Sequence, residues 1–165
     1  MDTTTLKMLY EQATALGMCD DFKKHWDKYG DNITIEQLCN MYQRGLDFCI
    51  KNDYPSVDFM DSNLKGEIEQ YGIYVNDKKI ATRQSNVVAN GDSEIIVLTD
   101  ETTDVTVRHN STVIIEVHGS AFVYVSMYDN SRMIVRYKNS SSRICVSHFG
   151  GTIETPELVD KVYEK

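Results

Sequence analysis

Residues 108–140, RHNSTVIIEVHGSAFVYVSMYDNSRMIVRYKNS, decide the fold, because four similar turns separate runs of alternating apolar residues. The turns begin at Arg108, Val117, Tyr128 and Tyr137, and the fourth residue of each is serine. Between the turns, apolar and polar residues alternate with a period of two, which is typical of β-strands. A short step and a long step alternate between successive turns, so every second turn is equivalent.

The same rhythm extends beyond this stretch. One set of turn residues falls at Asn90, Asn110, Asn130 and Gly150, and a second falls at Thr99, Gly119 and Asn139, both with a spacing of 20. An antiparallel meander has no reason to make every second turn equivalent, whereas a solenoid with two strands per coil stacks equivalent residues of successive coils. We therefore expect an α+β chain with a short parallel β-solenoid of about three to four coils. An antiparallel β-sandwich is the alternative.

In such a solenoid the stacked turn residues form a structural ladder. The amides of Asn90, Asn110 and Asn130 are expected to continue a hydrogen-bonded column along the axis. The complete set of predicted ladder positions is Asn90, Asn110, Asn130, Gly150, Gly119 and Asn139.

The N-terminal half has helical spacing instead. Apolar residues recur at three- and four-residue steps and predict helices near residues 6–16, 20–29, 34–52 and 58–71. Thr34 and Gln37 fit a capping box at the start of the third helix. We predict a helical capping subdomain over residues 1–85, the solenoid over 86–155 and a C-terminal cap or tail over 156–165.

Charge narrows the classes of partner. The chain has 165 residues, and 17 Lys and Arg against 25 Asp and Glu give a net charge of −8. Because nucleic-acid affinity comes chiefly from Lys and Arg, we expect no nucleic-acid partner and favour a protein partner. No apolar run is long enough to span a membrane, and the first residues do not resemble a secretory signal, so a cytoplasmic location is expected.

Motifs for chemistry are not found in the sequence. The four cysteines form no CxxC pair and the four histidines no HxxxH, so we predict no metal and no cofactor. The acids of the repeat occupy different columns of its period, and no GxSxG, P-loop or GxGxxG occurs. We therefore predict no catalytic residues and no enzymatic activity.

Aromatic residues of the repeat are the candidate interface. In a coil only two strands wide they cannot all point inward, and exposed aromatic surface is typical of interfaces. The candidate residues are Phe122, Tyr124, Tyr128, Tyr137 and Phe149. We predict a homo-oligomer, most simply a dimer or trimer, formed through the solenoid. Alternatively, the helical half covers these aromatics.

Residues 41–56, MYQRGLDFCIKNDYPS, followed by strands punctuated by Asn-Ser as at Tyr128-Asp-Asn-Ser, carry a resemblance. The chain resembles small proteins of unassigned function encoded by gut Bacteroidetes and their phages or prophages. The resemblance covers nearly the whole chain and implies a phage-linked accessory role in the cytoplasm of a bacterial host. It carries over no catalytic or binding residue.

Together these observations predict a non-enzymatic, phage-associated assembly or adaptor protein that acts through protein–protein interaction and self-association. The alternative is an inhibitor whose acidic surface binds a host enzyme or defence protein. A carbohydrate-binding module acting through surface tyrosines is a minor alternative.

Overall fold

The computed structural model describes residues 3–165, and the chain divides into two compact units, Met1–Ile68 and Glu69–Lys165. The boundary lies after Ile68 rather than after residue 85, because strands β1 (Ile73–Val75) and β2 (Lys78–Thr82) pair with later strands. Within the described residues, no helix has both the length and the apolar character needed to cross a membrane.

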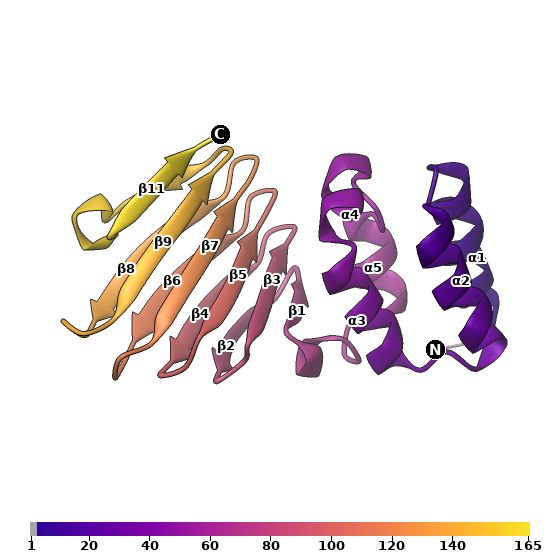
Figure 1. The fold of residues 1–165 in the computed structure, drawn as a ribbon, viewed down its shortest axis with the longest axis horizontal. Helices are drawn as coiled ribbons and strands as arrows, with labels where there is room; N and C mark the ends of the chain where they lie inside the picture. The colour runs from indigo at the N-terminus through magenta and orange to yellow at the C-terminus, as the bar shows by residue number, and fades with distance from the viewer. Residues whose placement is uncertain (1–2) are drawn as a thin grey trace. The chain divides into compact units, whose positions relative to one another are not determined.

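The first unit is helical (Figure 1). Its elements are α1 Thr3–Ala15, α2 Asp20–Tyr29, η1 Gly30–Asn32, α3 Ile35–Arg44, α4 Leu46–Asn52 and α5 Val57–Asn63. The capping box is confirmed, since the Gln37 amide donates to Thr34 Oγ1 and the Thr34 amide donates to Gln37 Oε1. Two predicted helices are shorter than expected: the third is interrupted at Gly45, a poor helix former, and the fourth ends at Asn63.

A buried tyrosine fixes part of this unit. Tyr54 is 8% exposed, and its hydroxyl donates a 2.7 Å hydrogen bond to the backbone carbonyl of Leu9 in α1. Burial raises the pKa of the Tyr54 phenol, and the Coulombic effect of Cys49 adds to the rise. The phenol therefore remains a hydrogen-bond donor at physiological pH.

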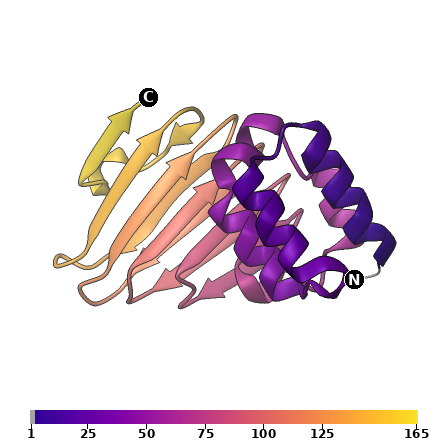
Figure 2. The same ribbon diagram turned by 45° about the vertical axis from the view of Figure 1, so that its right-hand side comes forward.

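The second unit is the predicted parallel β-solenoid with two strands per coil. Sheet A has the order β1-β3-β5-β7-β9-β11, sheet B has the order β10-β8-β6-β4-β2, and every pairing is parallel. Figures 1 and 2 show the two sheets as two layers, one behind the other. The remaining elements are η2 Glu69–Tyr71, β3 Asn86–Asn90, β4 Glu94–Thr99, β5 Thr103–Val107, β6 Thr112–Val117, β7 Phe122–Met127, β8 Arg132–Lys138, β9 Arg143–His148, β10 Thr152–Ile153, η3 Pro156–Leu158 and β11 Lys161–Glu164.

Coil length increases along the axis from β1 to β9. In sheet A the paired residues lie further apart in sequence at each step, as shown by Ile73 with Val88, Asn86 with Asp104, Thr103 with Val123, and Phe122 with Arg143. Five two-strand coils precede the final strand β11, rather than the expected three to four. The first coil does not show the 20-residue spacing found in the sequence, because its turns are shorter.

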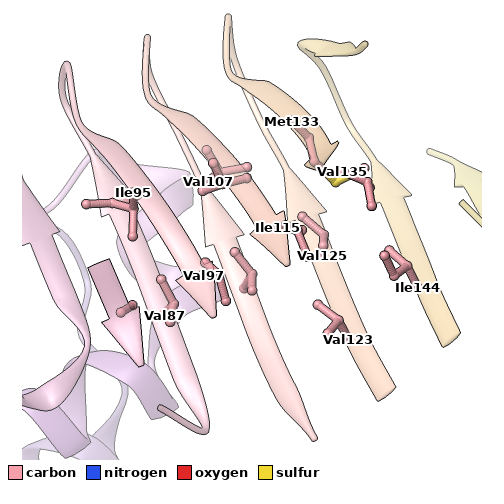
Figure 3. Packing of buried hydrophobic residues seen from close by; sticks show 14 of the residues in the cluster. Val87, Ile95, Val97, Val107, Ile115, Val123, Val125, Met133, Val135 and Ile144 are labelled. Atoms are coloured by element: carbon pink, nitrogen blue, oxygen red, sulfur yellow. The ribbon is translucent and has the colours of Figure 1, made fainter. Parts of the chain in front are cut away.

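The core lies between the two sheets, where the inward residues of each strand stack in columns (Figure 3). Such columns follow from the period-two alternation, because an in-register parallel pairing places every inward residue above another. The labelled core residues, each at most 2% exposed, are Val87, Ile95, Val97, Val107, Ile115, Val123, Val125, Met133, Val135 and Ile144.

A β-bulge makes the fourth coil one residue longer. In the pairing of β6 with β8, Ile115 lies opposite Val135, whereas Glu116 lies opposite Tyr137, so Arg136 is the extra residue. The bulge reverses the inward and outward positions that follow it. After this reversal Ile144 and Val146 are the inward residues of β9, and both are fully buried.

Part of the C-terminal segment packs against the core. Ile153, Leu158 and Val159 are partly buried against the core cluster. The following strand, β11, pairs with β9, so the segment over 156–165 extends sheet A as well as capping the core.

Candidate functional site

The structure does not contain the predicted asparagine ladder, and the difference begins at its first residue, Asn90. The side-chain amide of Asn110 donates a 3.1 Å hydrogen bond to the carboxylate of Asp92, which lies 18 residues earlier, not to Asn90. Asn90 is buried at the end of β3, opposite Val75. Asn110 and Asn130 are both exposed and each lies two residues before a paired residue, Thr112 or Arg132. The continuous ladder of three amides is therefore wrong, because coil length is not constant.

At the last coil the same corner is closed by two glycines. A Cβ on Gly150 would lie 2.9 Å from the backbone oxygen of Asp129, and a Cβ on Gly151 would lie 2.3 Å from the backbone oxygen of Ser131. Gly151 also has a φ of +90°, which L side chains rarely adopt. The predicted turn position Gly150 is thus a site of close backbone approach rather than a rung of hydrogen bonds.

Side-chain acceptors at this corner link the coils instead. Asn76, His109 and Asp129 have φ values of 49°, 57° and 57°, in the left-handed region. Each accepts a backbone N–H from a neighbouring coil: Asn76 Oδ1 from Asp92 at 2.9 Å, His109 Nδ1 from Gly91 at 3.2 Å, and Asp129 Oδ2 from His109 at 2.9 Å. These hydrogen bonds offset the strain of the left-handed conformation.

A column of buried serines lies directly beside these acceptors. Ser93, Ser111 and Ser131 are 2%, 0% and 0% exposed. The Ser93 amide donates to Ser111 Oγ at 3.3 Å, and Ser111 Oγ donates to the Gly91 carbonyl at 3.0 Å. The signal for this column was present in the repeated Asn-Ser and Asp-Ser pairs, in which the serine, not the asparagine, is the buried member.

The opposite corner differs from its prediction for a related reason. The backbone N–H of Asn139 donates to the Val117 carbonyl at 3.0 Å, so Asn139 does not lie opposite Gly119. The Gly119 carbonyl instead accepts hydrogen bonds of 3.0 Å from the hydroxyls of Ser141 and Ser142. The bulge in β8 has displaced the expected Gly119–Asn139 step.

The candidate interface aromatics divide between the two sheets. Four of them lie on, or directly after, strands of sheet A, and with Tyr163 of β11, which the sequence did not single out, they make up what we call the aromatic face: Phe122, Tyr124, Tyr128, Phe149 and Tyr163. Tyr137 belongs to sheet B and is stacked on His118, with ring centroids 4.7 Å apart. The predicted interface is therefore not one patch of all five residues.

Some rings of the aromatic face contact neighbouring side chains. Tyr128 and Phe149 stack with centroids 4.6 Å apart and an interplanar angle of 8°. The Lys161 ammonium lies 4.5 Å from the centroid of the Tyr163 ring, a cation–π contact. Phe122, Phe149 and Tyr163 are nevertheless 41%, 47% and 39% exposed.

A second apolar feature runs along the outer surface of sheet B. Ile80, Ile96, Ile114 and Ile134 lie directly opposite one another on four successive strands and form an isoleucine column. Ile80 is 62% exposed at one end of the column, whereas Ile114 is 9% exposed near its middle. The sequence signal was the apolar residue at the outward parity of several strands.

Carboxylates of the solenoid are engaged by basic side chains of other coils. Arg83 binds Asp100 with two hydrogen bonds, of 3.0 and 2.9 Å, and Arg136 binds Glu116 at 2.8 Å. Arg132 also pairs with Glu154. Among the described residues, no group of three or more His, Cys, Asp or Glu is arranged to hold a metal ion.

Asp160 anchors the beginning of β11. Its carboxylate accepts the Ile144 amide at 2.7 Å and contacts Lys138 at 2.6 Å and Arg143 at 3.0 Å. Burial acts to raise the pKa of Asp160, but the hydrogen bonds from Lys138, Ile144 and Arg143 outweigh it, and the pKa is lowered. The carboxylate is therefore ionised at neutral pH and holds β11 against β9.

His148 anchors the other end of the same strand. Its Nδ1 lies 2.8 Å from Glu164 Oε2, and this hydrogen bond raises the pKa of His148, although burial partly opposes the shift. A raised histidine pKa means that the folded chain favours the protonated ring. The resulting stabilisation is present in full below the unfolded pKa of about 6.5 and is lost as pH rises through the higher folded value.

We accordingly expect β11 to be held more firmly in mildly acidic than in alkaline solution. Hydrogen exchange of the Lys165 amide, which donates to the His148 carbonyl at 3.1 Å, measures this once intrinsic exchange rates are corrected for pH. The protection should fall as pH rises through the folded pKa of His148. In a His148→Gln variant this dependence should vanish, and protection that rose with pH in the unaltered chain would contradict the assignment.

Comparison with known proteins does not extend these observations. No protein-family model matches the chain, and no match is found among the curated proteins or the solved structures.

Proposed function

We propose that this chain is a non-enzymatic assembly or adaptor protein that acts through protein–protein contacts and associates with itself through its solenoid. The observation that carries the proposal is the aromatic face, on which Phe122, Phe149 and Tyr163 stay substantially exposed. Large aromatic side chains left exposed on one face of a sheet are typical of interfaces.

The construction of the solenoid supports the same role. Strands held on both sides by parallel partners form a stiff platform, and the corner hydrogen bonds from Asn76, His109 and Asp129 fix one coil upon the next. The carboxylates of Asp100 and Glu116 are bound by arginines that bridge coils. These acids act as structural groups, which favours a surface for binding over a site for chemistry.

Sedimentation of the purified chain across a wide concentration range tests the proposal. We expect a reversible dimer or trimer whose population grows with concentration in the micromolar range. Replacing Phe149 with serine on the aromatic face should leave the fold intact, since the side chain is 47% exposed. A chain that stays strictly monomeric at high micromolar concentration would contradict self-association.

The net charge of −8 favours a second candidate, an inhibitor that engages a basic site on a host enzyme or defence protein. The resemblance to phage-linked proteins of gut Bacteroidetes suits either role. Binding of such a partner should weaken steeply with added salt, because exposed charges are screened. Carbohydrate binding is less favoured, because Tyr128 and Phe149 turn ring faces toward each other instead of toward a sugar.

A further inference from the structure

The outer edge of β11 leaves the backbone of sheet A open beside exposed apolar side chains. Among the described residues, β11 is the last strand of sheet A and pairs only with β9. All four of its residues are exposed, and Val162 and Tyr163 are 37% and 39% exposed. An edge strand with free backbone N–H and C=O groups is a template for pairing with another chain.

The backbone groups available on this edge follow from the parallel pairing with β9. The Lys165 amide donates to the His148 carbonyl, and peptide groups alternate in direction along a strand. The peptide groups of Lys161, Tyr163 and Lys165 therefore face β9, and those of Val162 and Glu164 face away. The N–H and C=O of Val162 lie at the centre of the free edge.

We propose that two copies of this chain associate through this edge, with their β11 strands antiparallel and related by a two-fold axis at Val162. This inference rests on the proposed self-association and names a contact that contains one residue of the aromatic face, Tyr163. A two-fold axis makes the contact isologous, so each Val162 faces the same residue of the second copy, and the two exchange a reciprocal pair of N–H···O hydrogen bonds.

Two of the facing side-chain pairs are favourable in this register. Lys161 faces Tyr163 of the second copy, and the reverse pair forms across the axis, which extends the cation–π contact that Lys161 already makes at 4.5 Å within its own strand. Val162 meets a second β-branched side chain, a favourable cross-strand pair. Asp160 faces Glu164 of the second copy, and each of these acids is already paired within its own copy, Asp160 with Lys138 and Arg143 and Glu164 with His148.

The nearest alternative register is less favourable. An axis at Tyr163 would place Lys161 directly opposite Lys165 of the second copy, and like charges in directly opposed positions destabilise a sheet. The register centred on Val162 avoids this contact, and the acids that it does oppose, Asp160 and Glu164, have basic partners within their own copy. It joins the two six-stranded copies of sheet A into one continuous sheet.

A charge exchange at position 162 tests the contact and its register together. Because the axis places residue 162 opposite itself, Val162→Lys and Val162→Glu should each raise the dissociation constant at least tenfold when studied alone. An equimolar mixture of the two variants should recover dimers by sedimentation, as unlike charges then face each other. Protection of the Lys165 amide from exchange checks in every variant that β11 remains paired with β9.

Three further variants complete the test. Val162→Pro removes an N–H that faces away from β9 and should abolish the dimer, whereas Val162→Thr keeps that N–H and should leave it. Ile96→Lys alters the isoleucine column on sheet B and should have no effect. If the unaltered chain is monomeric, the proposed function fails together with this inference. If it is dimeric but Val162→Pro does not weaken the dimer, or the mixed variants do not recover, the β11 contact alone is wrong.

Discussion

Replacing Ile115 with alanine is expected to lower the free energy of unfolding of the solenoid by about 2–5 kcal/mol. Ile115 is fully buried on β6, between Val97 and Val135 of the neighbouring strands (Figure 3). Strands on both sides hold the surrounding backbone in register, so the cavity left by truncation cannot collapse. Urea denaturation followed by circular dichroism measures the loss.

The matched control is Ile80→Ala, which makes the same chemical change on the outer surface of sheet B. Ile80 is 62% exposed, so the variant should lose only about 0.5 kcal/mol. Equal losses in the two variants would contradict the assignment of Ile115 to the interior of the solenoid.

Replacing Gly151 with alanine is the second change for which we expect a large effect, a loss of about 3 kcal/mol. A side chain in the left-handed region costs about 1–2 kcal/mol, and forcing a Cβ into a filled space costs about 1–3 kcal/mol. Here the added Cβ would lie 2.3 Å from the backbone oxygen of Ser131, so the final coil must move away. Hydrogen exchange should show β10 and β11 opening first, because repeats lose neighbour contacts from the ends.

Gly119→Ala provides the comparison within the same solenoid. Gly119 also has a positive φ, of +64°, but the nearest atom to an added Cβ would be Asp100 Cβ at 3.8 Å, an ordinary contact. This variant should lose only about 1 kcal/mol, the conformational part of the cost. A loss as large as that of Gly151→Ala would show that backbone conformation alone, not close approach, requires glycine at position 151.

The sequence was sufficient to predict a coil of two strands, because one observation distinguished a solenoid from an antiparallel meander. The turns at Asn110 and Asn130 are equivalent while the turn between them is different, and only stacked coils make every second turn alike. The period-two pattern also placed Val123 and Val125 in the interior, where both are fully buried. These inferences depended on local patterns that coil stacking preserves.

The first coil could not be found in the same way. Its strand β2 begins with Lys78 and Lys79, which hide the apolar alternation, and Lys78 lies opposite Glu94, nearer in sequence than the fixed period requires. A search at fixed period therefore starts one coil too late. The strands remain in register because the turns absorb the difference in length.

The bulge at Arg136 limited how well the sequence could predict the direction of side chains at the candidate site. Without this extra residue, Tyr137 would continue the inward positions of Met133 and Val135, but it is 45% exposed on the outside of sheet B. Sequence alone does not reveal one inserted residue within a run of strand formers. The roles of His109 and Asp129 were hidden similarly, because left-handed φ values at non-glycine residues follow from the tertiary hydrogen bonds they accept.

The steady lengthening of the coils, from the pairing of Ile73 with Val88 to that of Phe122 with Arg143, restricts how this repeat can be altered. In a solenoid of constant period, one coil can be copied or deleted, because every coil fits every position. Here neighbouring coils differ in the number of residues they contain, so a duplicated coil would have a different length from the coil it replaces as a neighbour. The lengthening ends at β9, since Lys161 of β11 lies opposite Cys145, fewer residues away than Phe122 is from Arg143, so each coil has a length set by its own turns.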